Sequence, residues 1–135
     1  MYRMLLSDAP LSRARQWHGS NLYVIESVLR TGLRNQIPAS GNPPGVYSFN
    51  DARAHKMAYY SYYVLSGTGC AWTAFAELAI DPLQTKKFGD QHVTDEAGVC
   101  LVALWFHGVS QKHFTEEYIW PLWEPDLEVP IVSAE

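Results

Sequence analysis

Two apolar segments in the second half of the chain constrain the fold most. From Trp72 to Ile80, alternate residues share one face with a period of two, which is the period of a β-strand. From Val99 to Phe106 the chain is apolar without a break, which is typical of a buried strand. This run has eight residues, whereas a helix needs roughly 20 to cross a bilayer. The sequence therefore predicts a core rich in strands and no membrane span.

A helical pattern precedes these strands. The apolar residues between Leu22 and Leu29 have helical spacing and predict a helix over residues 21–31. Ser20 or Asn21 is placed to cap its first turn, because a short polar side chain accepts from a free backbone N–H there. Gly32 is placed to end the helix, because glycine adopts a positive φ at little cost.

A second helix is predicted from Ala52 through the tyrosine cluster at residues 59–63, with Asn50 or Asp51 as its cap. Between the two helices, residues 34–44 are rich in Asn, Pro, Ser and Gly and predict a loop. The next residues, 45–49, predict a short strand.

Strands and loops account for the rest of the chain. The polar residues 86–98 predict a loop, and residues 117–123 and 128–132 predict two further strands. Pro121 and Pro130 suggest that these strands lie at edges or carry bulges. Two early helices followed by a run of strands indicate the α+β class.

Length and composition bound the function. The 135 residues are 47% hydrophobic and 18% charged, and this length is close to the commonest size of one domain, so we expect a single domain over residues 1–135. The net charge of −4 comes without a basic stripe, which disfavours nucleic acid as a partner. The first residues lack the apolar length of a secretory signal, so we expect an intracellular protein or one delivered into a host cell. Cys70 and Cys100 are expected to be free thiols.

Several candidate reactive residues fit structural roles better than chemical ones. Cys100 lies in an apolar run, whereas a reactive thiolate needs an electropositive surround. His92, Asp95 and Glu96 lack a second His or Cys at ligand spacing, so we expect a solvated loop and no metal site. His107 is expected to be a surface histidine.

The segment from Trp17 to Ser20 is different. His18 is followed at once by Gly19, at the end of a predicted strand and before a helix. Because glycine has no side chain, a ligand can approach its backbone closely beside the histidine ring. Alone, the pattern also fits an ordinary turn.

Three separated segments together resemble the diphtheria-toxin-like, or poly(ADP-ribose) polymerase, group of ADP-ribosyltransferases. They are residues 17–20 with 31–34, then 45–49, then 116–120. In that family, His-Gly-Ser, Gly-Ile-Tyr-Phe and Glu-Tyr-Ile-Val segments occur in this order and hold a His-Tyr-Glu triad. The resemblance covers roughly residues 15–123. It implies two small antiparallel sheets that form an NAD cleft with two short helices.

The resemblance implies that four residues bind the adenosine part of NAD or the carboxamide group of its nicotinamide. His18 would hydrogen-bond the adenosine ribose. The backbone of Gly19, followed by Ser20 in the same motif, would receive the carboxamide. Arg34 matches the arginine that contacts the adenosine side.

It also implies the groups that hold and release nicotinamide. Tyr47 would stack on the nicotinamide ring, and Tyr59 or Tyr60 would lie on its other face. Glu117 matches the catalytic glutamate, which binds the nicotinamide ribose. Loss of nicotinamide develops positive charge on that ribose, and a fixed carboxylate stabilises such charge best in a dry site. No metal is required.

The expected activity is therefore mono-ADP-ribosyl transfer from NAD to a macromolecular acceptor with release of nicotinamide. A protein acceptor is favoured over a nucleic acid because of the acidic balance. One alternative is a catalytically silent module that binds NAD or ADP-ribose. Another is an NAD-dependent RNA 2′-phosphotransferase, against which the net charge of −4 counts.

Overall fold

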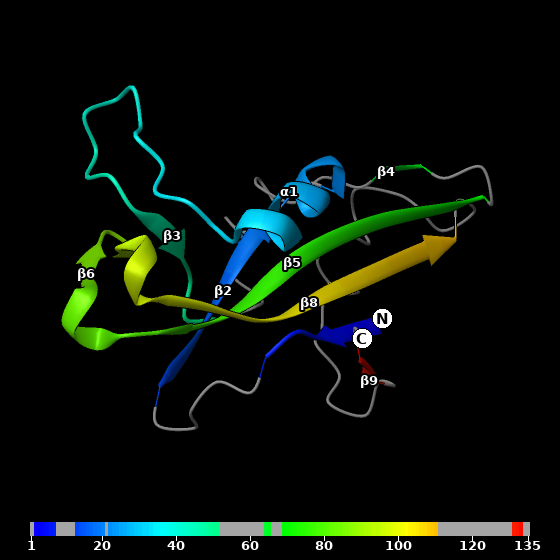
Figure 1. Cartoon of the computed structure of the whole chain (residues 1–135). Coiled ribbons are helices and arrows are strands. Elements are labelled where there is room, and N and C mark those ends of the chain that lie inside the picture. Colours follow the sequence, from blue (N-terminus) through cyan, green and yellow to red (C-terminus); the bar gives the residue numbers. More distant parts are fainter. Residues whose placement is uncertain are drawn as a thin grey trace.

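The computed structural model of the chain describes residues 2–7, 13–20, 22–51, 64–65, 69–110 and 131–133. Within them, strands dominate and form two sheets, and one α-helix lies against the larger sheet (Figure 1). The α+β class predicted from the sequence is confirmed. The second predicted helix and the predicted strand at 117–123 lie outside the described residues.

The larger sheet has the strand order β2-β5-β8-β1-β9, and β4 pairs with β5 beyond the end of β2. All its ladders are antiparallel except the parallel pair of β1 and β9. Its strands are β1 (Tyr2–Leu5), β2 (Ala14–Ser20), β4 (Val64–Leu65), β5 (Cys70–Ile80), β8 (Val99–Ser110) and β9 (Ile131–Ser133).

The long strands β5 and β8 are the two strands that the apolar segments predicted. They pair from Cys70 opposite Ser110 to Ile80 opposite Val99, with a register shift after Glu77. Nearly every residue of β5 is buried, so its side chains, which point alternately to the two sides of the sheet, are buried on both sides. The sheet therefore has a core on each side.

The core on one side is aliphatic and is covered by the helix. Small and branched side chains from β5 and β8 pack there against one residue of the helix and one of the smaller sheet. They are Ala74, Ala76, Leu78, Ile80 and Leu104, with Ile25 and Val46.

The helix begins later than predicted. Residues Leu22–Val24 form the 3-10 turn η1, and α1 spans Ile25–Thr31 instead of 21–31. Val24 is its N-cap and makes no side-chain capping bond. Ser20 is therefore not the cap: it is the last residue of β2, where its backbone is held by the sheet.

Gly32 and Gly45 are two of the five described glycines with a positive φ, a conformation that other residues rarely adopt. Gly32 (φ +73°) ends α1 as predicted, and its N–H donates to the Val28 carbonyl at 2.8 Å. Gly45 (φ +155°) immediately precedes β3, and a Cβ there would lie 2.5 Å from Cγ1 of Val93. Close packing against Val93 thus fixes the start of β3.

The smaller sheet has the order β3-β7-β6, with β3 at Val46–Ser48, β6 at Thr85–Phe88 and β7 at Gln91–Thr94. The prediction of a loop over residues 86–98 was therefore wrong in its first part. A turn at Gly89 (φ +60°) joins the two strands, and the residues of β6 look loop-like because they are largely exposed.

Two capped 3-10 turns connect the sheets. They are η3 (Pro82–Gln84) after β5 and η4 (Glu96–Gly98) before β8. Asp81 and Asp95 cap them, each accepting a backbone N–H. The Asp81 N–H donates to the Gly98 carbonyl at 2.9 Å, which holds the two turns together.

The chain end segments add strands that local patterns did not fully indicate. The four-residue strand β1 lies between β8 and β9, although the sequence around it has no clear period. The strand β9 is the last in the sheet order, consistent with an edge near Pro130. None of the described helices is long and apolar enough to span a membrane.

Candidate functional site

His18 lies on β2 with its ring hydrogen-bonded to the neighbouring sheet. Its Nδ1 is 2.6 Å from the carbonyl oxygen of Tyr47. Burial lowers the pKa of His18 and outweighs the hydrogen bond to Tyr47, which raises it. The ring is therefore neutral near pH 7. Because a carbonyl can only accept, Nδ1 carries the proton and Nε2 presents a lone pair.

The same hydrogen bond takes the place of a backbone pair between β2 and β3. Trp17 and Phe49 exchange two backbone hydrogen bonds, each 2.8 Å long. Continued in register, that ladder would next pair Gly19 with Tyr47. The ring of His18 occupies the Tyr47 carbonyl instead.

This leaves the backbone of Gly19 facing the edge of the sheet. Backbone groups alternate in direction along a strand, so the N–H and C=O of Gly19 point to the same side as those of Trp17, away from β5. Among the described residues, nothing hydrogen-bonds to Gly19 on that side. Gly19 is buried, so this donor and this acceptor lie inside the protein, one residue after His18 on β2.

Buried polar residues support this edge. Ser20 is buried on the face that also carries His18. Ser48 of β3 donates from Oγ to Oε1 of Gln16 at 3.4 Å, and both residues are buried. The Gln16–Ser48 contact therefore holds β2 and β3 at a fixed separation next to His18.

The ring of Tyr47 is held over the smaller sheet. Its hydroxyl donates to the carbonyl of Pro43 in the loop before β3. Its ring meets that of Phe88 edge to face, with centroids 6.3 Å apart. Phe88 was not a predicted site residue. The signal that could have indicated it is that it is the sole aromatic residue in the polar segment that forms β6. Tyr47 thus has a fixed orientation and a half-buried ring.

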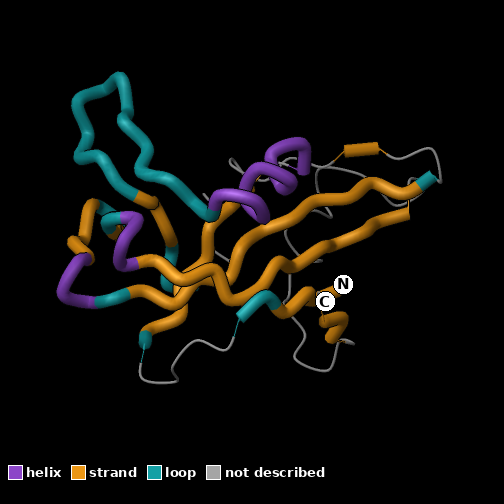
Figure 2. The backbone as a smooth tube through the Cα atoms, viewed as in Figure 1, coloured by secondary structure: helices purple, strands orange, loops and turns teal. Residues whose placement is uncertain are grey.

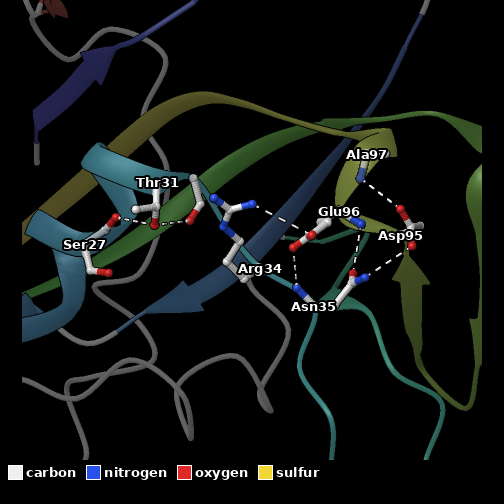
Figure 3. Close-up of polar contacts among 8 residues, drawn as sticks. Ser27, Thr31, Arg34, Asn35, Asp95, Glu96 and Ala97 are labelled. Atoms are coloured by element: carbon white, nitrogen blue, oxygen red, sulfur yellow. Dashed lines mark hydrogen bonds and ion pairs between the residues drawn. The ribbon is translucent and has the colours of Figure 1, made fainter.

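Arg34 lies at the foot of the loop between α1 and β3, which extends away from both sheets (Figure 2). Its side chain is 67% exposed, and its Nη1 is 3.8 Å from Oε1 of Glu96. Figure 3 shows Arg34 and Asn35 directed toward Glu96 and Asp95 at the turn η4. The structure thus pairs the predicted adenosine-side arginine with a carboxylate.

Asn35 fastens that loop to η4. Its backbone N–H donates to Oε2 of Glu96 at 2.9 Å, and its Oδ1 accepts from the Glu96 N–H at 2.9 Å. Its Nδ2 donates to Asp95 at 3.2 Å. The next residue, Gln36, exchanges backbone hydrogen bonds with Gly45, which closes the base of the loop. Through Gly45 this base continues directly into β3 and Tyr47.

Three of the residues set aside on sequence grounds have defined surroundings. His107 is 7% exposed and belongs to β8, so the prediction of a surface histidine was wrong; burial lowers its pKa to about 4. Cys70 and Cys100 are free, as predicted. Among the described residues, no group of three His, Cys, Asp or Glu side chains is placed to hold a metal ion.

A buried carboxylate that the sequence did not single out lies on the other face of the larger sheet. Oε2 of Glu77 accepts from Nε of Arg3 and from the Trp105 indole, both at 2.9 Å, and its Oε1 is 3.7 Å from Nε of Arg15. Glu77 is 7% exposed. Because its oxygens are engaged by these partners, we assign it a structural role. We call Glu77, Arg3, Arg15 and Trp105 the Glu77 cluster.

The structure brings together part of the predicted site. The ring of His18, next to Gly19 on β2, contacts the backbone carbonyl of Tyr47. The ring of Tyr47 lies against Phe88, and Arg34 lies at the base of the adjoining loop. Glu117, Tyr59 and Tyr60 lie outside the described residues. No protein-family model matches the chain, and no curated protein matches it.

Proposed function

We propose that the protein is an NAD-dependent ADP-ribosyltransferase that transfers a single ADP-ribose to a macromolecular acceptor. The observation that carries the proposal is the neutral His18, whose Nδ1 is bonded to the Tyr47 carbonyl and whose Nε2 keeps a lone pair, one residue before Gly19 on β2. The order of the three motifs in the sequence gives the proposal its second support.

The polar groups at this edge complement two parts of NAD. A ribose hydroxyl can donate to Nε2 of His18, which has no proton of its own. A carboxamide has one acceptor and one donor group, and the N–H and C=O of Gly19 offer the matching donor and acceptor. Since Gly19 has no side chain, the carboxamide can reach both groups.

Tyr47, whose backbone carbonyl contacts His18, is proposed to supply an aromatic surface for nicotinamide. An offset-stacked ring pair contributes about 1 kcal/mol beyond the burial of area. The hydrogen bond to Pro43 and the contact with Phe88 restrict the ring, so less freedom is lost when a flat ligand binds. Tyr59 or Tyr60 is proposed for the opposite face of nicotinamide.

Glu117 is proposed to assist the bond cleavage. The bond between C1′ of the ribose and the nicotinamide nitrogen breaks, and its electron pair stays on the nitrogen, which leaves as neutral nicotinamide. The carboxylate stabilises the positive charge that develops on the ribose. A nucleophilic group of the acceptor then bonds to C1′ and loses its proton to solvent. The acidic balance of the chain favours a protein acceptor.

The test follows nicotinamide release from NAD by chromatography and NAD binding by calorimetry. Glu117→Gln is expected to lower turnover by roughly 10²–10³-fold, as removal of one transition-state contact does elsewhere, while NAD binding is retained. Glu116→Gln is the matched control and should turn over like the wild type. Unchanged turnover in Glu117→Gln would overturn the assignment. Binding without turnover in the wild type would instead support a silent NAD-binding module.

A further inference from the structure

Arg34 and Glu96 form an unequal pair. Glu96 is fixed, because its backbone N–H and its Oε2 are both hydrogen-bonded to Asn35 at 2.9 Å. Arg34 is loosely held, because its only contact among the described residues is 3.8 Å long, beyond the range of a direct hydrogen bond. The fixed carboxylate of Glu96 therefore lies next to the Arg34 guanidinium, whose side chain can reorient toward a ligand.

The open atoms of this pair fit two neighbouring hydroxyl groups. Oε1 of Glu96 accepts no hydrogen bond from any described residue, so it can accept one from a ligand. The guanidinium of Arg34 has only donors. A hydroxyl group both donates and accepts, so one hydroxyl of a vicinal diol can donate to Glu96 while the other accepts from Arg34. A ribose carries such a diol.

The local charge opposes a phosphorylated ribose. Asp95 lies beside Glu96 on the same turn, and both carboxylates are bonded to Asn35. Two carboxylates against one guanidinium leave a net negative charge. A phosphate ester in place of one hydroxyl adds about two negative charges, which these carboxylates repel, and it removes the O–H group that would donate a hydrogen bond to Glu96.

We propose that Glu96, together with Arg34, is the specificity-determining pair that accepts the free ribose diol of NAD and rejects the 2′-phosphorylated ribose of NADP. The inference rests on the proposed function for the identity of the dinucleotide. Its placement rests on the loop base, where Asn35 leads into the Gln36–Gly45 bridge and so to the β3 strand that carries Tyr47. Glu96 was set aside on sequence grounds as part of a solvated loop.

The experiment measures binding of NAD and NADP by calorimetry and their turnover by nicotinamide release. Wild-type protein is expected to prefer NAD over NADP by tenfold or more. Glu96→Gln keeps an amide oxygen for the Asn35 N–H but removes the charge, and it should reduce that preference by about tenfold. Glu26→Gln is the matched control, because Glu26 makes an exposed ion pair with Arg30 on α1, and its preference should equal that of the wild type.

A second variant covers the case in which Glu96→Gln does not fold. Arg34→Gln changes an exposed side chain and should weaken NAD binding several-fold while its melting temperature stays that of the wild type. An unchanged NAD preference in Glu96→Gln, or unchanged NAD binding in Arg34→Gln, overturns this inference and leaves the proposed function intact. Failure of the wild type to bind either dinucleotide overturns both.

Discussion

The two faces of β5 are both buried, but different forces hold them. On the α1 face, aliphatic side chains such as Leu78 and Leu104 pack without directional bonds. On the opposite face, the Glu77 cluster and the rings of Trp17, Phe75 and Trp105 combine ionic hydrogen bonds with aromatic contacts. The stacked pair of Phe75 and Trp105 has centroids 6.0 Å apart. The candidate site belongs to the first face, where His18 and Ser20 interrupt an apolar surface.

The two faces differ in whether their polar groups are already bonded within the protein or are left to bind a ligand. In the Glu77 cluster the buried carboxylate is surrounded by donors, which leaves little of it for a ligand. At His18 one ring nitrogen has a partner, and no described residue hydrogen-bonds to the buried Gly19 backbone on the side away from β5. We therefore expect the opposite face to control stability and the His18 edge to control binding.

The largest expected effect is at Glu77. Glu77→Ala leaves Arg3, Arg15 and the Trp105 indole without their shared acceptor, so the free energy of unfolding should fall by about 3–5 kcal/mol. Urea denaturation measures the change. Leu104→Ala on the other face should cost about 3 kcal/mol through a cavity. A loss below about 1 kcal/mol for Glu77→Ala would show that the cluster does not hold this face.

The next effect is the pH dependence of stability from His107. Burial lowers its pKa in the folded protein to about 4, whereas an unfolded histidine titrates near pH 6.5. Between these values the unfolded chain binds more protons, so stability is present above pH 6.5 and is lost as the pH falls toward 4. The free energy of unfolding should fall by about 2 kcal/mol between about pH 7 and pH 5 from this group alone.

His18 adds to this trend, because its pKa is lowered as well. Urea denaturation at several pH values tests the prediction with His107→Gln, in which the slope over this range should become shallower. A slope equal to that of the wild type would show that His107 titrates normally in the folded state.

The smallest expected effect is at Tyr47. Tyr47→Phe removes the hydrogen bond to Pro43 but keeps the ring, so the free energy of unfolding should fall by about 1 kcal/mol. NAD affinity should change by less than about threefold, because stacking is retained. Tyr47→Leu is the contrasting variant and should weaken NAD binding by about tenfold, since it loses the aromatic surface. Equal affinities of the two variants would contradict a stacking role for Tyr47.

Local patterns were enough to predict β5, β8 and the end of α1 at Gly32. Alternation, an unbroken apolar run and a glycine stop each act within a few residues, so the sequence displays them directly. The hairpin of β6 and β7 was missed because its exposed residues, such as Lys86 and Lys87, resemble a loop. Strand β1 was missed because its four residues are held mainly by pairing with β8, far away in the chain.

The sequence supplied candidate site residues but not the contacts that they make. Motif order pointed to His18, Gly19 and Tyr47, but the Nδ1 proton of His18 depends on a carbonyl 29 residues away. The Glu77 cluster joins Glu77 to Arg3 across 74 residues, and no local pattern encodes such a pairing. The role proposed for Glu96 depends on Asn35, 61 residues earlier, which hydrogen-bonds to it.

The most direct test of the account is an NMR titration of NAD into isotope-labelled protein, following the amide of Gly19 and Nε2 of His18. Both signals are expected to shift along one saturation curve, with the His18 signal changing from that of a nitrogen with a free lone pair to that of a hydrogen-bonded nitrogen. His18→Phe should remove the saturation. Saturable NAD binding that leaves Gly19 and His18 unperturbed, or no binding up to roughly 10 mM NAD, beyond the usual range of KM values, would contradict it.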